Sequence, residues 1–140
     1  MFDPNCIFCN IVEGEIPSTK VYEDDICLAF RDINPLAPTH VLVIPKTHIE
    51  SCAELTEEHE ALIGHIFTVI AKIARDLGLD NGFRVVSNAG LEAGQTVPHI
   101  HFHILAGRPM SAKGWYPTDA APQTKLNEVK QKFSQTASTF

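Results

Sequence analysis

The chain has 140 residues, of which 44% are hydrophobic and 20% are charged, and this composition predicts one ordinary globular domain. Its net charge of −6 argues against a general surface for nucleic acids or anionic membranes. Because it contains neither a signal-peptide pattern nor an apolar run of about 20 residues, we expect a cytoplasmic protein with no membrane partner.

The first half of the chain predicts a short helix and three strands. Residues 6–18 begin with one or two helical turns and end at a glycine and a proline. Residues 20–35 alternate on both sides of an acidic turn, which predicts a hairpin-like pair of strands. Residues 39–45 are rich in β-branched side chains and predict a third strand.

Residues 55–79 predict one long helix. Thr56 is a plausible N-cap, acidic residues follow in the first turn, and Gly78 closes the helix. Apolar residues recur at helical spacing, namely Leu62, Ile63, Ile66, Phe67, Ile70, Ile73, Ala74 and Leu77.

Two further strands, residues 82–88 and 99–105, are joined by a loop with glycines at 90 and 94. Strands, a long helix and then strands again indicate the α+β class, with an antiparallel sheet of about five strands and the helix on one face. We expect residues 1–110 to form the domain and residues 111–140 to form a C-terminal tail.

The stretch VPHIHFHIL places a histidine at every second position. Because successive side chains of a strand point to opposite faces, His99, His101 and His103 share one face. A plain polar row facing solvent is the alternative. Three of the seven histidines in one register favour nucleophilic attack, proton transfer or metal ligation instead.

The middle histidine, His101, is a candidate nucleophile if its other ring nitrogen donates to a carbonyl oxygen, because that bond leaves a lone pair for the substrate. The loop from Asn88 to Thr96 offers backbone N–H groups, an amide and a hydroxyl that suit a phosphate. Taken alone, its glycines are explained more simply as a turn of the chain.

The chain has four cysteines, which in a reducing compartment are expected to be thiols or metal ligands. Cys6 and Cys9 have the spacing of two zinc ligands, but such a pair alone also fits two buried thiols. We expect Cys27 and Cys52 to pack as small apolar residues.

The stretch GQTVPHIHFHIL closely resembles the motif of the histidine triad nucleotide-binding proteins. Residues 6–18, 21–49 and 74–90 also resemble this family, so the resemblance covers roughly residues 6–110. It implies a homodimer with a continuous ten-stranded antiparallel sheet and two nucleotide sites. The chemistry it implies is hydrolysis at the α-phosphorus of a nucleoside 5′-phosphate derivative.

The resemblance also implies roles for single residues. His101 matches the nucleophile, His103 the histidine that contacts the phosphate, and His40 a histidine behind the nucleophile that orients it or relays a proton. Asp32 matches the acid that binds the ribose hydroxyls. The other residues expected to bind the nucleotide are Phe8, Ile33, Leu42, Asn88, Gln95 and Thr96.

Bacterial members of the family complete a structural zinc site with a histidine after the third strand and the first histidine of the triad. In this chain those positions are His48 and His99, which would join Cys6 and Cys9 as ligands. The resemblance suggests no catalytic metal.

The activity implied is that of a purine nucleoside phosphoramidase, which cleaves the P–N bond of adenosine or guanosine 5′-phosphoramidates and related acyl or aminoacyl nucleotides. The alternatives are a dinucleoside polyphosphate hydrolase and a nucleotide-binding scaffold with incidental hydrolysis. In the tail, Trp115 and Tyr116 are expected to reach the partner subunit's site, and residues 125–133 form either a short helix or part of a mobile tail.

Overall fold

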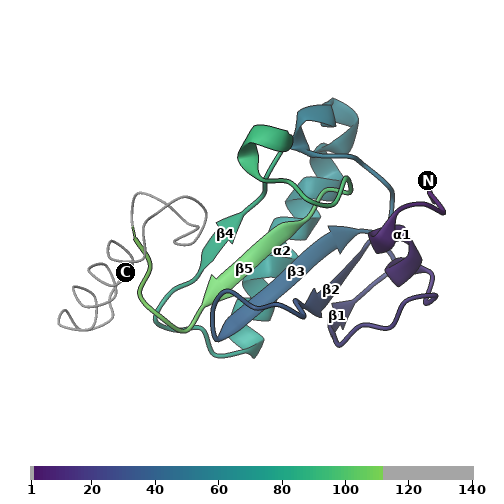
Figure 1. Cartoon of the computed structure of the whole chain (residues 1–140). Coiled ribbons are helices and arrows are strands. Elements are labelled where there is room, and N and C mark those ends of the chain that lie inside the picture. Colours follow the sequence, from purple (N-terminus) through teal and green to yellow (C-terminus); the bar gives the residue numbers. More distant parts are fainter. Residues whose placement is uncertain (1, 112–140) are drawn as a thin grey trace.

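The computed structural model describes residues 2–111, which form a five-stranded sheet with helices on both faces (Figure 1). The strands are β1 (Lys20–Glu23), β2 (Cys27–Arg31), β3 (Thr39–Pro45), β4 (Arg84–Val86) and β5 (Phe102–Ala106). Their order is β1-β2-β3-β5-β4, and each neighbouring pair is antiparallel. The predicted α+β class is therefore confirmed, whereas the expectations for Trp115, Tyr116 and residues 125–133 lie outside the described residues.

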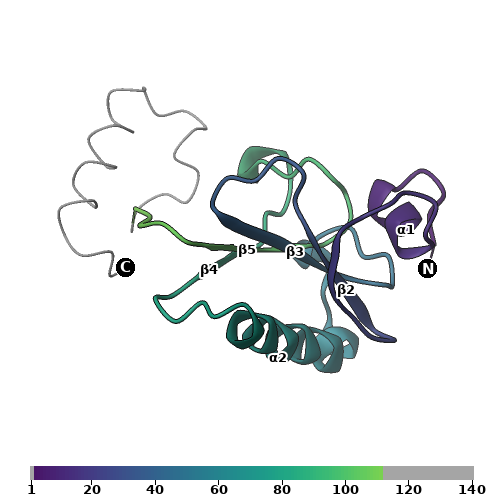
Figure 2. The ribbon, with the colours of Figure 1, turned by 90° about the horizontal axis from the view of Figure 1, so that it is seen from below.

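The two faces of the sheet carry different elements. The long helix α2 (Glu60–Asp76) covers one face, and the short helix α1 (Ile7–Val12) lies on the other, where it packs in one apolar cluster with residues of β2 and β3 (Figure 2). Across residues 2–111, no helix has both the length and the hydropathy needed to span a bilayer.

The long helix begins later than its cap. Thr56 caps a single 3₁₀ turn, η2 (Glu57–His59), by accepting a hydrogen bond from the Glu58 N–H, and α2 continues directly from that turn. After α2, the chain turns at Gly78, whose φ of +69° suits a glycine.

The apolar stripe of α2 packs on the sheet as predicted, with one exception. Ile66, Ile70 and Ile73 are fully buried in the core. Phe67 was expected among them, but it is 48% exposed, although its ring contacts that of Phe102 edge to face with the centroids 5.5 Å apart. The reason is its place at the margin of the apolar stripe, where the helix surface turns away from the sheet.

The strand that carries the histidine row is shorter than predicted. β5 starts at Phe102, so His99 and His101 precede the ladder. The predicted alternation nevertheless holds, because Ile100, Phe102 and Ile104 all enter the core beneath α2. The histidines therefore belong to the face opposite the long helix, as expected.

The turn between β1 and β2 is tied to α2 through one carboxylate. Asp24 accepts hydrogen bonds from the N–H groups of Ile26 and Cys27, from the Tyr22 hydroxyl and from the His65 ring, at 2.7–2.9 Å. Burial alone would raise the pKa of Asp24, but these four donors outweigh it and hold the pKa well below its usual range.

Asp24→Asn should lower the free energy of unfolding by about 1–3 kcal/mol at pH 7, because it removes a charged acceptor from four donors. The native pKa lies below the unfolded value of about 3.9. The carboxylate therefore stabilises the fold above that pH, and the contribution fades as the pH falls towards the native pKa.

Urea unfolding at pH 7 and at pH 3 measures this effect, and the gap between Asp24→Asn and wild type should be smaller at pH 3. The matched control is Asp25→Asn, which changes the exposed neighbouring acid and should stay within about 0.5 kcal/mol of wild type. Equal gaps at both pH values would contradict the assigned role of Asp24.

Candidate functional site

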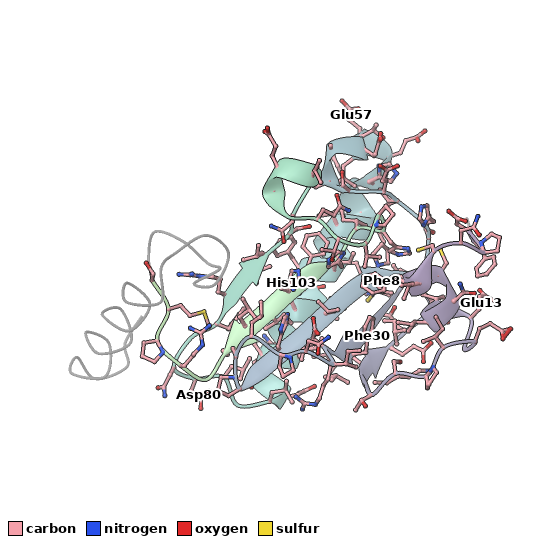
Figure 3. The ribbon with its side chains drawn as sticks, viewed as in Figure 1. Phe8, Glu13, Phe30, Glu57, Asp80 and His103 are labelled. Atoms are coloured by element: carbon pink, nitrogen blue, oxygen red, sulfur yellow. The ribbon has the colours of Figure 1, made fainter. Side chains whose placement is uncertain are left out.

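The histidine face of the sheet brings three buried imidazoles together, two from β5 and the residue before it and one from β3. The rings of His101 and His103 lie 5.0 Å apart, and those of His40 and His103 lie 5.1 Å apart. Each of the three residues is at most 6% exposed. Figure 3 shows His103 over the middle of the sheet, on the same side as Phe8 of α1.

The proton position on His101 follows from its partner. Its Nδ1 lies 2.7 Å from the carbonyl oxygen of His99, and because a carbonyl can only accept, Nδ1 must carry the proton. In the neutral ring this leaves the lone pair on Nε2. The condition set from the sequence for a nucleophilic histidine is therefore met by the geometry.

A backbone acceptor orients His101, whereas a backbone donor orients the His40 ring. Its Nδ1 accepts a hydrogen bond from the Leu36 N–H at 3.1 Å, so its proton sits on Nε2. That Nε2–H points at His103 Nδ1, 2.9 Å away, with a carboxylate oxygen of Asp32 at 3.5 Å. The arrangement places an acid and a hydrogen-bonded pair of histidines beside His101.

Burial keeps these imidazoles neutral. It is the main cause that lowers the pKa of His40 and of His101 below their usual value, and it lowers the pKa of His103 to about 3. The bond to the His99 carbonyl and the charge of Asp32 oppose this effect at His101 without reversing it. At neutral pH, the lone pair of His101 is consequently available.

Four side chains form a separate cluster at the junction of α1 with the sheet. His99 Nδ1 lies 3.3 Å from Cys6 Sγ and 3.6 Å from Cys9 Sγ, and His48 Nδ1 lies 3.3 Å from Cys9 Sγ. One donor atom from each of the four residues falls within 4.8 Å of the others. The four predicted ligands are thus close enough together to hold a metal ion.

The chemistry of this donor set also fits a metal. His99 Nε2 donates to the carbonyl oxygen of Pro45 at 2.9 Å, which leaves the Nδ1 lone pair facing the sulfur atoms. Burial lowers the pKa of His99 to about 4, so its ring is neutral. Two thiols and two imidazoles form a set that zinc prefers in structural sites.

The expected walls of the base pocket differ in exposure. Phe8 is buried, and its ring meets those of His101 and Phe30 edge to face at 5.1 and 5.6 Å. Leu42 is buried next to it in the same apolar cluster. Ile33, in the loop before β3, is 91% exposed and offers a free apolar side chain to a ligand.

The loop before the histidines is held by its own polar side chains. The Gln95 amide donates to the carbonyl oxygens of Glu50 and Val97 and accepts from the Gly90 N–H. The Asn88 amide donates to the Ala93 carbonyl at 2.7 Å. These bonds shape the loop and leave Thr96 exposed at its end.

Several contacts that define the site involve residues that the sequence did not single out. Ser87, just after β4, donates to the His101 carbonyl at 2.8 Å, and the backbone groups of Leu36 and Pro45 orient histidines. Backbone groups leave no trace in a side-chain pattern. One expectation was wrong, because Cys52 is exposed at the start of a single 3₁₀ turn, whereas Cys27 is fully buried as predicted.

Comparison with known proteins shows which family the chain resembles. The model of the HIT domain family matches residues 13–110. The purine nucleoside phosphoramidase of Escherichia coli strain K12 is 48% identical over 105 residues, which cover 74% of this chain and 88% of that protein.

Solved structures similar to this chain also belong to HIT family proteins. A histidine triad protein from Clostridium difficile is 50% identical, with a TM-score of 0.78 over 81% of this chain and 100% of that one. A HIT family hydrolase from Legionella pneumophila Philadelphia 1 is 46% identical, with a TM-score of 0.77 over 78% of this chain and 98% of that one.

Proposed function

Because the chain belongs to the HIT domain family, we propose that it is a purine nucleoside phosphoramidase that releases AMP or GMP from nucleoside 5′-phosphoramidates and related acyl or aminoacyl nucleotides. The observation that carries the proposal is the bond from His101 Nδ1 to the His99 carbonyl, which directs a lone pair away from the backbone. A relative with that activity is 48% identical.

The reaction proceeds by two displacements. His101 Nε2 attacks the α-phosphorus, the P–N bond breaks, and the departing amine takes a proton, which leaves a nucleotidyl-imidazole. Water then attacks the same phosphorus, the bond from phosphorus to His101 Nε2 breaks, and the nucleoside monophosphate departs. The proton that this water gives up balances the one that the amine took, and His101 is free again. Two steps allow the amine to leave before water must attack.

The neighbouring residues bind the rest of the substrate in this proposal. His103 contacts the phosphate, together with Asn88 and Thr96 of the preceding loop. Gln95 acts by shaping that loop, because both of its amide protons go to backbone carbonyl oxygens. Asp32 accepts hydrogen bonds from the ribose hydroxyls, and its position 3.5 Å from His40 keeps the acid beside the histidines.

The base lies among apolar side chains. Phe8, Ile33 and Leu42 form its walls, and the exposed Ile33 becomes covered when the nucleotide binds. Burying one such side chain contributes about 1.5–3 kcal/mol.

His101→Asn should abolish turnover of adenosine 5′-phosphoramidate, with a loss of more than about 10³-fold in kcat, because the asparagine amide has no nucleophilic lone pair in place of Nε2. Release of AMP by purified protein is the measurement. The control, His59→Asn, alters a histidine of η2 outside the site and should turn over at the wild-type rate.

The other candidate functions make different predictions for the same proteins. Faster turnover of diadenosine polyphosphates than of phosphoramidates would indicate a dinucleoside polyphosphate hydrolase. Tight nucleotide binding without turnover by folded wild type would indicate a nucleotide-binding scaffold and overturn the phosphoramidase.

The metal that fits Cys6, Cys9, His48 and His99 is, in this proposal, a structural zinc ion. It would close the junction between α1 and the sheet without touching substrate, because all four ligands come from the protein. Metal analysis of purified wild type should find about one zinc per chain. Cys6→Ser should lose it, whereas Cys52→Ser, which changes an exposed cysteine outside the cluster, should retain it.

A homodimer completes the proposal, with the ten-stranded sheet continuing across β4. This strand has three residues and lies at the edge of the sheet, a position at which another strand can add to the sheet. Beside it, Phe83 is 41% exposed, and residues 81–84 and 107–110 line a cavity of about 400 Å³.

Light scattering on the protein as it elutes from a size-exclusion column should give twice the chain mass of 15.4 kDa. Asp in place of Phe83 should shift the mass towards a single chain, because it buries a charge at the interface. Asp in place of the distant, exposed Ile7 is the control. A wild-type mass of one chain would rule out the dimer.

A further inference from the structure

His99 belongs to both groups of side chains on the histidine face. Its Nδ1 faces the sulfur atoms of Cys6 and Cys9 at 3.3 and 3.6 Å. Its backbone oxygen accepts the bond from His101 Nδ1 at 2.7 Å. A shift of the His99 backbone would therefore change the orientation of the His101 ring directly, because a single hydrogen bond joins them.

The backbone at this point receives little support from the sheet. The ladder of β5 begins only at Phe102. Before it, the His99 N–H bonds locally to the Val97 carbonyl at 2.8 Å, and the Ile100 N–H bonds to the Ile49 carbonyl at 2.6 Å. The side chain of His99 is thus a principal anchor of the carbonyl that orients His101.

A second link runs through Phe8 of α1, which lies between Cys6, the N-cap of that helix, and Cys9 in the sequence. Its ring meets His99 at 5.9 Å and His101 at 5.1 Å, in both cases edge to face. A helix of six residues is not stable by itself, so α1 depends on its contacts with the sheet. Ligation of Cys6 and Cys9 would hold both α1 and Phe8 against the nucleophile.

We propose that occupation of the cysteine and histidine cluster orients the nucleophile, with His99 as the positioning residue between them. The cluster contributes to turnover without touching substrate, because one of its ligands is His99, and the backbone oxygen of His99 sets the tautomer and direction of the His101 ring. The expected effect on kcat rests on the proposed phosphoramidase function, whereas the expected effect on the His101 ring does not.

The first test compares the side-chain nitrogen resonances of histidine in zinc-loaded wild type, Cys9→Ser and Cys52→Ser, with His101→Asn used to assign the His101 signal. Wild type and Cys52→Ser should show one His101 tautomer, protonated at Nδ1. Cys9→Ser should show a mixture of the two tautomers, because the His99 side chain is then held at one ring nitrogen only, by its bond to the Pro45 carbonyl, and its backbone oxygen is less firmly placed.

The second test measures turnover of adenosine 5′-phosphoramidate by the same proteins. Cys9→Ser should lose about 10-fold in kcat, the worth of one hydrogen bond, with KM within about 2-fold of wild type. Cys52→Ser should match wild type in both constants. If Cys9→Ser does not fold, His48→Gln replaces it, because His48 is the least buried of the four ligands.

Two results would overturn the proposal. One is a folded, zinc-free variant that keeps the wild-type tautomer of His101 and the wild-type kcat. The other is wild type that takes up no zinc on titration. Absence of turnover by zinc-loaded wild type would instead contradict the proposed function, and the resonance comparison would still decide whether the cluster orients His101.

Discussion

The alternation of side chains through residues 99–104 is the constraint on which the rest of the molecule depends. Ile100, Phe102 and Ile104 are buried beneath α2, and removing such side chains from water is the main favourable contribution to folding. Because neighbouring residues of an extended chain point in opposite directions, burial of these three forces the histidines to the other face. The same packing that buries the core residues therefore also places the histidines of the site.

Backbone groups then decide what each histidine can do. The carbonyls of Pro45 and His99 and the N–H of Leu36 each bond to one ring nitrogen, and this assigns the proton on three different imidazoles. Burial of the same rings keeps them neutral. A set of identical residues therefore acquires distinct roles: Nε2 of His101 presents a lone pair, Nε2 of His40 a proton, and Nδ1 of His99 a lone pair towards the sulfur atoms.

The contacts that stabilise the fold and the side chains of the candidate site lie on different faces of the sheet. The Asp24 network links the β1–β2 turn to α2 on the core side, away from the histidines. On the other side, the loops around Asp32 and Gln95 are shaped by short hydrogen bonds to their own backbone. The sheet and α2 therefore hold the segment that leads from His101 into β5, whereas the loops that face it are shaped locally.

The sequence by itself determined the class of the fold, the order of its elements and the residues of the histidine row, because hydrophobic periodicity and alternation are local properties of the chain. It also pointed to the four clustered side chains through their resemblance to a family. Only the tertiary structure decided that β5 starts after His101, that Phe67 and Cys52 are exposed, and which ring nitrogen carries the proton in His40, His99 and His101. The exposures follow from how α2 and its neighbours pack on the sheet. The proton positions follow from backbone groups, near in the chain for His40 and His101 and distant for His99, which bonds to Pro45, and a pattern of side chains records none of them.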